Sequence, residues 1–145
     1  MVGPYGYCAD ISRTFVEGKK LSNYQNKIHS LAYENVKYNE QLIKPGVSFR
    51  EFAEKAWQLP DNCFDNHYPC QIHGVGMSDE WPYIGYPDED YSNGDYSGTF
   101  QENMVVCVES YIGEVSANEG AKLEDQYLVT EKSLELLSSI PLDLI

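Results

Sequence analysis

The sequence predicts an α+β fold in which two helices pack on the outside of a sheet. A continuous apolar run at residues 104–109 is typical of a buried strand. An apolar stripe at spacings of three and four over residues 22–43 indicates an amphipathic helix. Residues 7–15 alternate with period two, which indicates a further strand. The 145 residues are enough for one domain with a real core, spanning residues 1–145.

The first half of the chain carries signals for both helices. Ser22 is a plausible N-cap for the long helix, and Pro45-Gly46 ends it. Ser48 with Glu51 three residues later forms a capping box that starts the second, shorter helix. Residues 59–66 read as a loop.

The second half of the chain is predicted to be mostly strands. His73 is expected on a glycine-rich turn, followed by an irregular surface loop or flap over residues 80–103. Residues 111–115 continue the sheet, and residues 120–130 form another strand. Residues 132–139 form either a short helix or a turn into a last strand.

Composition argues against nucleic acid and a membrane as binding partners. The formal net charge of −13 would repel a phosphate backbone, so nucleic acid is an unfavourable partner. No run approaches the roughly 20 apolar residues of a membrane-spanning helix, and no leader peptide is visible. The four cysteines form no Cys-x-x-Cys pair, which favours reduced thiols in a cytoplasmic protein. We therefore expect neither nucleic acid nor a membrane as a partner.

Four residues stand out as candidate metal ligands: Asp10, His73, Glu109 and Glu124. Each has a simpler structural interpretation, because Asp10 could pair with Arg13, Glu109 could pair with a lysine, and Glu124 could face solvent. Together they form a set of oxygen donors plus one imidazole, delivered by separate strands. Such a set suits one or two divalent cations such as Fe, Mn, Co or Zn.

The motifs around these residues resemble the creatinase/methionine aminopeptidase superfamily, whose fold is known as pita-bread. They are Gly6-Tyr7-Cys8-Ala9-Asp10-Ile11-Ser12-Arg13-Thr14, His73-Gly74-Val75-Gly76, Val108-Glu109 and Leu123-Glu124-Asp125, in the family's order and approximate spacing. The resemblance implies a curved, mostly antiparallel sheet that carries the ligands inside. It also implies two metal ions per intact site, with Asp10 and Glu124 bridging both and with His73 and Glu109 completing one.

The chain departs from this pattern in two ways. The family's further aspartate ligand falls before Met1, so the chain resembles the C-terminal part of a pita-bread metal-binding catalytic domain, with the N-terminal half missing. The peptidases carry a second histidine seven residues after the ligand histidine, where this sequence has Glu80. That departure puts peptide hydrolysis in doubt.

The stretches 68–82 and 84–87 are similar to the dimethylsulfoniopropionate (DMSP) lyases built on this fold. The resemblance implies β-elimination of DMSP to dimethyl sulfide and acrylate, with Asp79 as the catalytic base and Tyr68 as a substrate-binding residue. It further implies iron as the metal and a homodimer at full length. Trp81, Tyr83 and Tyr86 are additional candidates for an aromatic wall around the sulfonium, although ordinary packing explains such residues equally well.

Two other functions remain open. One is a metallopeptidase that hydrolyses Xaa-Pro dipeptides or removes N-terminal residues, against which the missing second histidine argues. The other is a non-catalytic pita-bread module used for binding, against which the four convergent ligands argue. Metal content would separate the binding module from the two enzymes.

Overall fold

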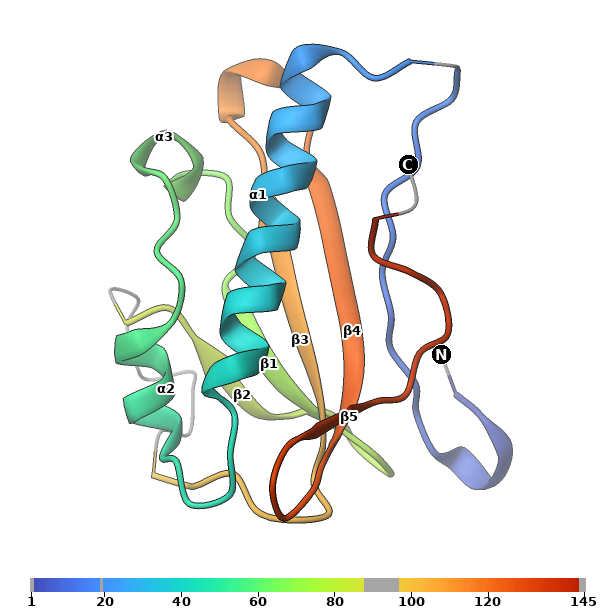
Figure 1. Cartoon of the computed structure of the whole chain (residues 1–145), viewed down its shortest axis with the longest axis vertical. Coiled ribbons are helices and arrows are strands. Elements are labelled where there is room, and N and C mark those ends of the chain that lie inside the picture. The colour runs from blue at the N-terminus through green and yellow to red at the C-terminus, as the bar shows by residue number, and fades with distance from the viewer. Residues whose placement is uncertain (1, 19, 88–96, 144–145) are drawn as a thin grey trace.

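The protein folds around one antiparallel sheet, seen in a computed structural model that describes residues 2–18, 20–87 and 97–143 (Figure 1). The strand order is β2-β1-β3-β4-β5, and each neighbouring pair is antiparallel. The strands are β1 (Cys70–Val75), β2 (Asp79–Gly85), β3 (Val105–Ile112), β4 (Ala121–Val129) and β5 (Leu134–Leu136). The α+β prediction is confirmed.

The helices begin at the predicted caps. Ser22 caps α1 (Asn23–Asn39), accepting a hydrogen bond from the Gln25 backbone N–H while the Gln25 side chain accepts one from Ser22. Ser48 caps α2 (Phe49–Lys55) by accepting from the Glu51 backbone N–H. The remaining helical segments are short: α3 (Asp61–Phe64) and the 3-10 turns Pro4–Gly6, Glu40–Leu42 and Val115–Ala117.

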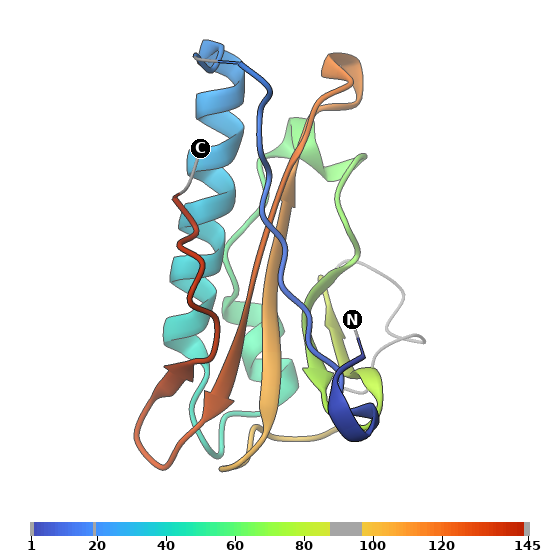
Figure 2. The same cartoon turned by 90° about the vertical axis from the view of Figure 1, so that its right-hand side faces the viewer.

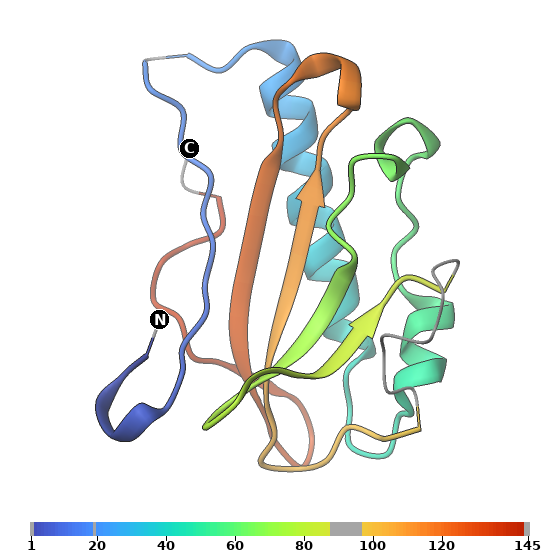
Figure 3. The same cartoon turned by 180° about the vertical axis from the view of Figure 1, so that it is seen from behind.

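Helix α1 lies along one face of the sheet and contacts β3 and β4 (Figures 1 and 2). The apolar core fills the space between these two layers. Its members from α1 and the central strands are Ile28, Ala32, Val36, Ile72, Val106, Val108, Ile112, Ala121, Leu123, Tyr127 and Val129. Seen from behind, the opposite face of β1, β3 and β4 is not crossed by any described helix (Figure 3).

The N-terminal segment is extended, but it is not the predicted strand. It runs beside β4 and forms a single backbone bridge there, between Ser12 and Glu124 (Figure 2). Thr14 explains why the ladder stops, because its hydroxyl donates to the Lys122 carbonyl and accepts from the Lys122 N–H. A side chain thus occupies the backbone groups that another bridge would need.

The predicted turn at His73 is wrong, because His73 lies within strand β1. Asp79 then begins β2, so residues 80–85 form a strand where the first part of the loop over residues 80–103 was expected. Gly74 accounts for the misleading signal: a Cβ at this position would lie 2.0 Å from the Trp81 carbonyl oxygen. The glycine is therefore needed for close approach of two strands rather than for a turn. Residues 88–96 of the predicted flap lie outside the described residues.

Smaller differences complete the comparison. Residues 59–66 contain the short helix α3. The sheet predicted over residues 111–115 is wrong beyond residue 112, because β3 ends there and Val115 begins a 3-10 turn. Of the two predictions for residues 132–139, the last strand is correct and appears as β5. None of the described helices has the length and apolar character needed to cross a membrane.

Candidate metal and substrate site

One buried polar cluster of the three central strands lies on the face opposite α1. His73 lies on β1 directly opposite Cys107 on β3, and Glu109 lies on β3 opposite Glu124 on β4. Because side chains alternate along a strand, residues two apart share a face. Cys107 and Glu109 therefore point the same way, as do Lys122 and Glu124.

Three of the four predicted ligands meet at this face. His73 Nε2 lies 3.1 Å from Glu124 Oε1 and 3.7 Å from Glu109 Oε1. All three residues are buried, with exposed fractions of 3%, 2% and 0% for His73, Glu109 and Glu124. Buried ionisable groups are costly unless they pair or bind a cation, so this cluster is not explained by packing.

Lys122 is a fourth member of the cluster that the sequence reasoning missed. Its Nζ lies 2.9 Å from Glu109 Oε2 and 3.6 Å from Glu124 Oε2. The structural interpretation of Glu109 as the partner of a lysine is thus confirmed. Lys122 lies two residues before Glu124 on a predicted strand, so the period-two rule could have placed it on the same face.

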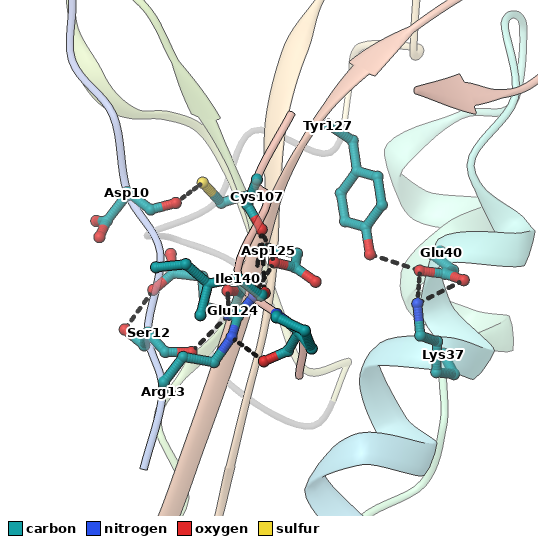
Figure 4. A network of polar contacts seen from close by, with 12 residues as sticks. Asp10, Ser12, Arg13, Lys37, Glu40, Cys107, Glu124, Asp125, Tyr127 and Ile140 are labelled. Carbon is teal, nitrogen blue, oxygen red and sulfur yellow. Dashed lines mark hydrogen bonds and ion pairs between the residues drawn. The ribbon is translucent and has the colours of Figure 1, made fainter. Parts of the chain in front are cut away.

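Asp10 approaches the cluster from the N-terminal segment. Its backbone N–H donates to Gln126 Oε1 at 3.0 Å, and its carbonyl accepts a hydrogen bond from Cys107 Sγ at 3.2 Å (Figure 4). Burial raises the pKa of the Asp10 carboxyl, and the negative charge of Glu124 raises it further. The simpler interpretation of Asp10 as a partner of Arg13 is not confirmed, because Arg13 pairs with Asp125.

The cluster has a defined pattern of charge. Burial alone would lower the pKa of His73, but the hydrogen bond to Glu124 and the charge of Glu109 raise it to about 9. Burial would raise the pKa of Glu124, yet hydrogen bonds from His73 and Ser12 hold it below its ordinary value. Burial raises the pKa of Glu109 against the opposing effect of Lys122. Glu124 is thus more readily ionised than Glu109.

The donor set fits a divalent cation. One donor atom each from His73, Cys107 and Glu124 lies within 4.8 Å of the other two. Imidazole, thiolate and carboxylate are all ligands of first-row divalent metals. The Cys107 thiol was not among the predicted ligands, although it stands two residues before Glu109 on the predicted strand.

The predicted catalytic and substrate residues border the cluster on two sides. Asp79 Oδ1 lies 3.9 Å from His73 Nδ1, with 35% of the Asp79 side chain exposed rather than desolvated as expected. The Tyr68 ring lies 4.7 Å from Lys122 Nζ, so this ring already contacts a cation. Of the other aromatic candidates, Trp81 is 58% exposed, whereas Tyr86 is buried and packs edge-on against His67.

Comparisons with known proteins agree with this geometry. The model of metallopeptidase family M24 matches residues 1–131. The dimethylsulfoniopropionate lyase DddP of Roseovarius nubinhibens is 38% identical over 145 residues, covering 99% of this chain and 32% of that protein. The DddP of Roseobacter denitrificans is 36% identical with the same coverage. The chain therefore spans about a third of the length of these curated relatives.

Solved structures share the fold. The prolidase from Pyrococcus horikoshii OT3 superimposes with a TM-score of 0.74 at 27% identity, covering 97% of this chain and 38% of that one. An Xaa-Pro dipeptidase from Bacillus anthracis gives a TM-score of 0.75 at 25% identity, covering 97% and 38%. These structures confirm the predicted pita-bread architecture. By the match over residues 1–131, the chain belongs to metallopeptidase family M24.

Proposed function

We propose that this chain forms the metal-binding part of a lyase that cleaves dimethylsulfoniopropionate to dimethyl sulfide and acrylate. The observation that carries the proposal is the 36–38% identity to two such lyases over nearly the whole chain. The site supports it, because Asp79 and Tyr68 border the His73 cluster from separate positions. A substrate with an anionic end and a sulfonium end could contact both.

The residues proposed to hold the metal are Asp10, His73, Glu109 and Glu124. Two ions per intact site are proposed, with iron favoured over Mn, Co and Zn. When bound, the divalent metal supplies Lewis acidity that lowers the energy of negative charge developing on the substrate carboxylate. The homodimer, the cytoplasmic location and the small-molecule substrate belong to the same proposal.

Tyr68 is proposed to receive the sulfonium end of the substrate. Aromatic faces attract soft cations, and the Tyr68 ring lies 4.7 Å from the Lys122 ammonium. Burial raises the pKa of the Tyr68 phenol, and the charge of Glu109 adds to this effect. The phenol therefore stays neutral at ordinary pH, and its ring contacts the cation without forming an ion pair.

Asp79 is proposed to remove the proton next to the substrate carboxylate. Its carboxylate stands at the start of β2, beside His73 and open enough for a small substrate to reach. The proton moves to Asp79, the C–H pair forms the new double bond, and the C–S pair leaves with dimethyl sulfide. Acrylate remains, and Asp79 then returns its proton to solvent.

Headspace dimethyl sulfide released from DMSP tests this proposal. The assay uses the metal-loaded chain and a fusion that restores the length of the curated relatives. Chelator-sensitive release supports the lyase. We expect Asp79→Ala to abolish release while leaving the bound metal unchanged, whereas Glu131→Ala, an exposed carboxylate in the turn after β4, retains activity. Equal loss of metal and activity would make Asp79 a ligand or a structural residue instead of the base, and no release from either loaded protein would overturn the lyase.

The second candidate is hydrolysis of Xaa-Pro dipeptides or removal of N-terminal residues. The solved prolidase and dipeptidase neighbours favour it. Glu80 stands where the peptidases have their second histidine. It is the second residue of β2, directly after Asp79, and its backbone is left-handed (φ 65°). We expect no proline release from Xaa-Pro dipeptides. Proline release without dimethyl sulfide would replace the first proposal with the second.

A further inference from the structure

A cavity lies on the α1 side of the sheet, away from the polar face that carries His73, Glu109 and Glu124. Residues of the N-terminal segment, the start of α1 and the start of β4 line it, near the end of the molecule where the chain enters α1 (Figure 1). Its volume of about 280 Å³ is just below the roughly 300–1,000 Å³ of ligand pockets, so its occupant has to be small. Its apolar walls are formed by Phe15, Val16, Leu21, Ile28 and Ala121.

His29 brings an unpaired polar atom to this cavity. The side chain lines the cavity and is only 7% exposed. Its Nε2 atom has no hydrogen-bond partner among the residues that the structure describes. Buried polar side-chain atoms in folded proteins are nearly always paired, with protein or with another molecule. A ligand in the cavity would supply the partner that the chain itself does not.

The other nitrogen of the ring determines what kind of partner Nε2 needs. Burial lowers the pKa of His29, against the opposing effect of a hydrogen bond with the Leu142 backbone, so the ring is neutral at ordinary pH. Because Nε2 is unpaired, the nitrogen that bonds Leu142 is Nδ1. A backbone group that raises the pKa of an imidazole is an acceptor, so Nδ1 carries the proton and donates it to the Leu142 carbonyl. Nε2 is left with a lone pair, and its partner has to be a donor.

Carboxylates surround the cavity. Glu17 and Glu119 line it and are exposed, and the negative charge of Asp143 also acts on His29. Glu119 Oε1 accepts a hydrogen bond from Gln25 Nε2 at 2.9 Å, which holds this carboxylate in place. No lysine or arginine among the described residues lines the cavity. The electrostatic potential at its opening therefore favours a cation over an anion.

We propose that the cavity binds a small aliphatic amino alcohol, whose hydroxyl donates to His29 Nε2 while its ammonium group faces Glu17 and Glu119. The hydrocarbon chain between the two groups contacts the apolar walls. The neutral hydroxyl takes the buried end, because burying an ammonium group beside a neutral imidazole costs much more free energy. The inference does not rest on the proposed function, because the cavity and the metal cluster lie on opposite faces of the sheet.

Nuclear magnetic resonance titration of the 145-residue chain with linear amino alcohols, from aminopropanol to aminohexanol, tests the proposal. We expect at least one length to bind with a dissociation constant on the order of 1 mM, as for a ligand with few non-hydrogen atoms. The shifted signals should come from the residues that line the cavity. The alkylamine and the alcohol of the same length, which each lack one of the two polar groups, should bind roughly fivefold more weakly. Absence of binding at every length, or shifts confined to β1 and β2, would overturn the proposal.

His29→Leu separates the two ends of the ligand. It removes the acceptor and keeps an apolar side chain, so we expect the amino alcohol to bind roughly fivefold more weakly and the alkylamine to bind as before. His29→Gln restores an acceptor and should recover part of the affinity. Unchanged binding of the amino alcohol by folded His29→Leu would overturn the role of His29.

The carboxylates give a test that does not depend on how the His29 variants fold. The double variant Glu17→Gln and Glu119→Gln should weaken the amino alcohol and leave the neutral alcohol unaffected. Glu131→Gln with Glu135→Gln is the control with the same change in charge, because both residues are exposed and neither lines the cavity. Equal weakening by the two double variants would mean that net charge alone attracts the amine, and the assigned site would be wrong.

Discussion

The two faces of the central strands are equally buried but opposite in chemistry. Facing α1, Ile72, Val108 and Leu123 are fully buried and contribute to the apolar core. On the other face of the same strands, His73 and Glu124 are 3% and 0% exposed. Burial alone therefore does not distinguish the apolar residues that stabilise the sheet from the ionisable residues of the polar cluster.

The difference shows how one β-ladder serves two purposes. Alternation along each strand separates an apolar set from an ionisable set within a few residues of sequence. The apolar set gains free energy from packing against α1, whereas the ionisable set is tolerated because Lys122 and His73 balance Glu109 and Glu124. Substitutions on the two faces should accordingly have separable effects.

The largest effect on stability is expected on the face toward α1. Leu123→Ala removes a fully buried side chain and leaves a cavity, so we expect the free energy of unfolding to fall by about 2–5 kcal/mol. Metal affinity of the remaining folded protein should stay within about a factor of two, because the neighbouring Glu124 keeps its strand position. Urea denaturation and zinc titration measure the two quantities.

Exposed Leu136 on β5 is the control, and Leu136→Ala should change stability by much less. A large loss of metal affinity in Leu123→Ala, measured well below its unfolding midpoint, would mean that the two faces are coupled through the backbone.

The polar face should make the metal-free chain sensitive to pH. The pKa of His73 rises from its ordinary 6.5 to about 9 in the folded chain. Its stabilising contribution is therefore complete below about pH 6.5 and is lost as the pH rises through about 9. Each pKa unit corresponds to about 1.4 kcal/mol, so the loss is at most about 3.5 kcal/mol.

Urea denaturation of the chelator-treated chain at pH 6 and pH 9.5 measures this loss. His73→Gln should flatten the profile between these values. His29, whose pKa burial lowers, lies on α1 at the apolar side, and His29→Gln should leave the alkaline profile unchanged. A wild-type chain whose stability rises over this range would contradict the charged state assigned to His73.

Part of this two-faced arrangement can be predicted from the sequence. Apolar periodicity locates α1, β3 and β4, and Ser22 and Ser48 mark the starts of both longer helices. The prediction of a turn at His73 is wrong for a physical reason. Gly74 allows β1 and β2 to approach closely, and in a sequence a glycine needed for close approach looks the same as a glycine needed for a turn. The strand predicted for the N-terminal segment is wrong because hydrogen bonds from its side chains to β4 take the place of a backbone ladder.

The candidate site is predictable only where a residue type suggests its chemistry. His73, Glu109 and Glu124 were expected to converge and do so. Cys107 and Lys122 were missed, because a cysteine in an apolar run reads as core and a single lysine reads as surface. The register between neighbouring strands decides whether Cys107 and Lys122 lie beside the other polar residues. That register depends on strand pairings that a single sequence does not specify.

The smallest expected effect tests how the N-terminal segment supports the polar face. Ser12 Oγ donates to Glu124 Oε2 at 2.7 Å (Figure 4). The nearby Thr14 hydroxyl instead bonds only the Lys122 backbone. Ser12→Ala keeps the backbone bridge to Glu124 and removes one hydrogen bond to a carboxylate. We expect it to cost about 1 kcal/mol in stability and to weaken zinc binding by roughly tenfold.

Thr14→Val is the matched control for that substitution. It removes hydrogen bonds from the same segment to the same strand, so it should lower stability by about 1 kcal/mol while leaving zinc affinity unchanged. Denaturation and zinc titration of both variants give the comparison. If the two variants weaken zinc binding equally, the N-terminal segment supports zinc binding only by packing against β4. If only Ser12→Ala does, the Ser12 hydroxyl orients Glu124 for the cation, and the polar face extends beyond the sheet into the segment that carries Asp10.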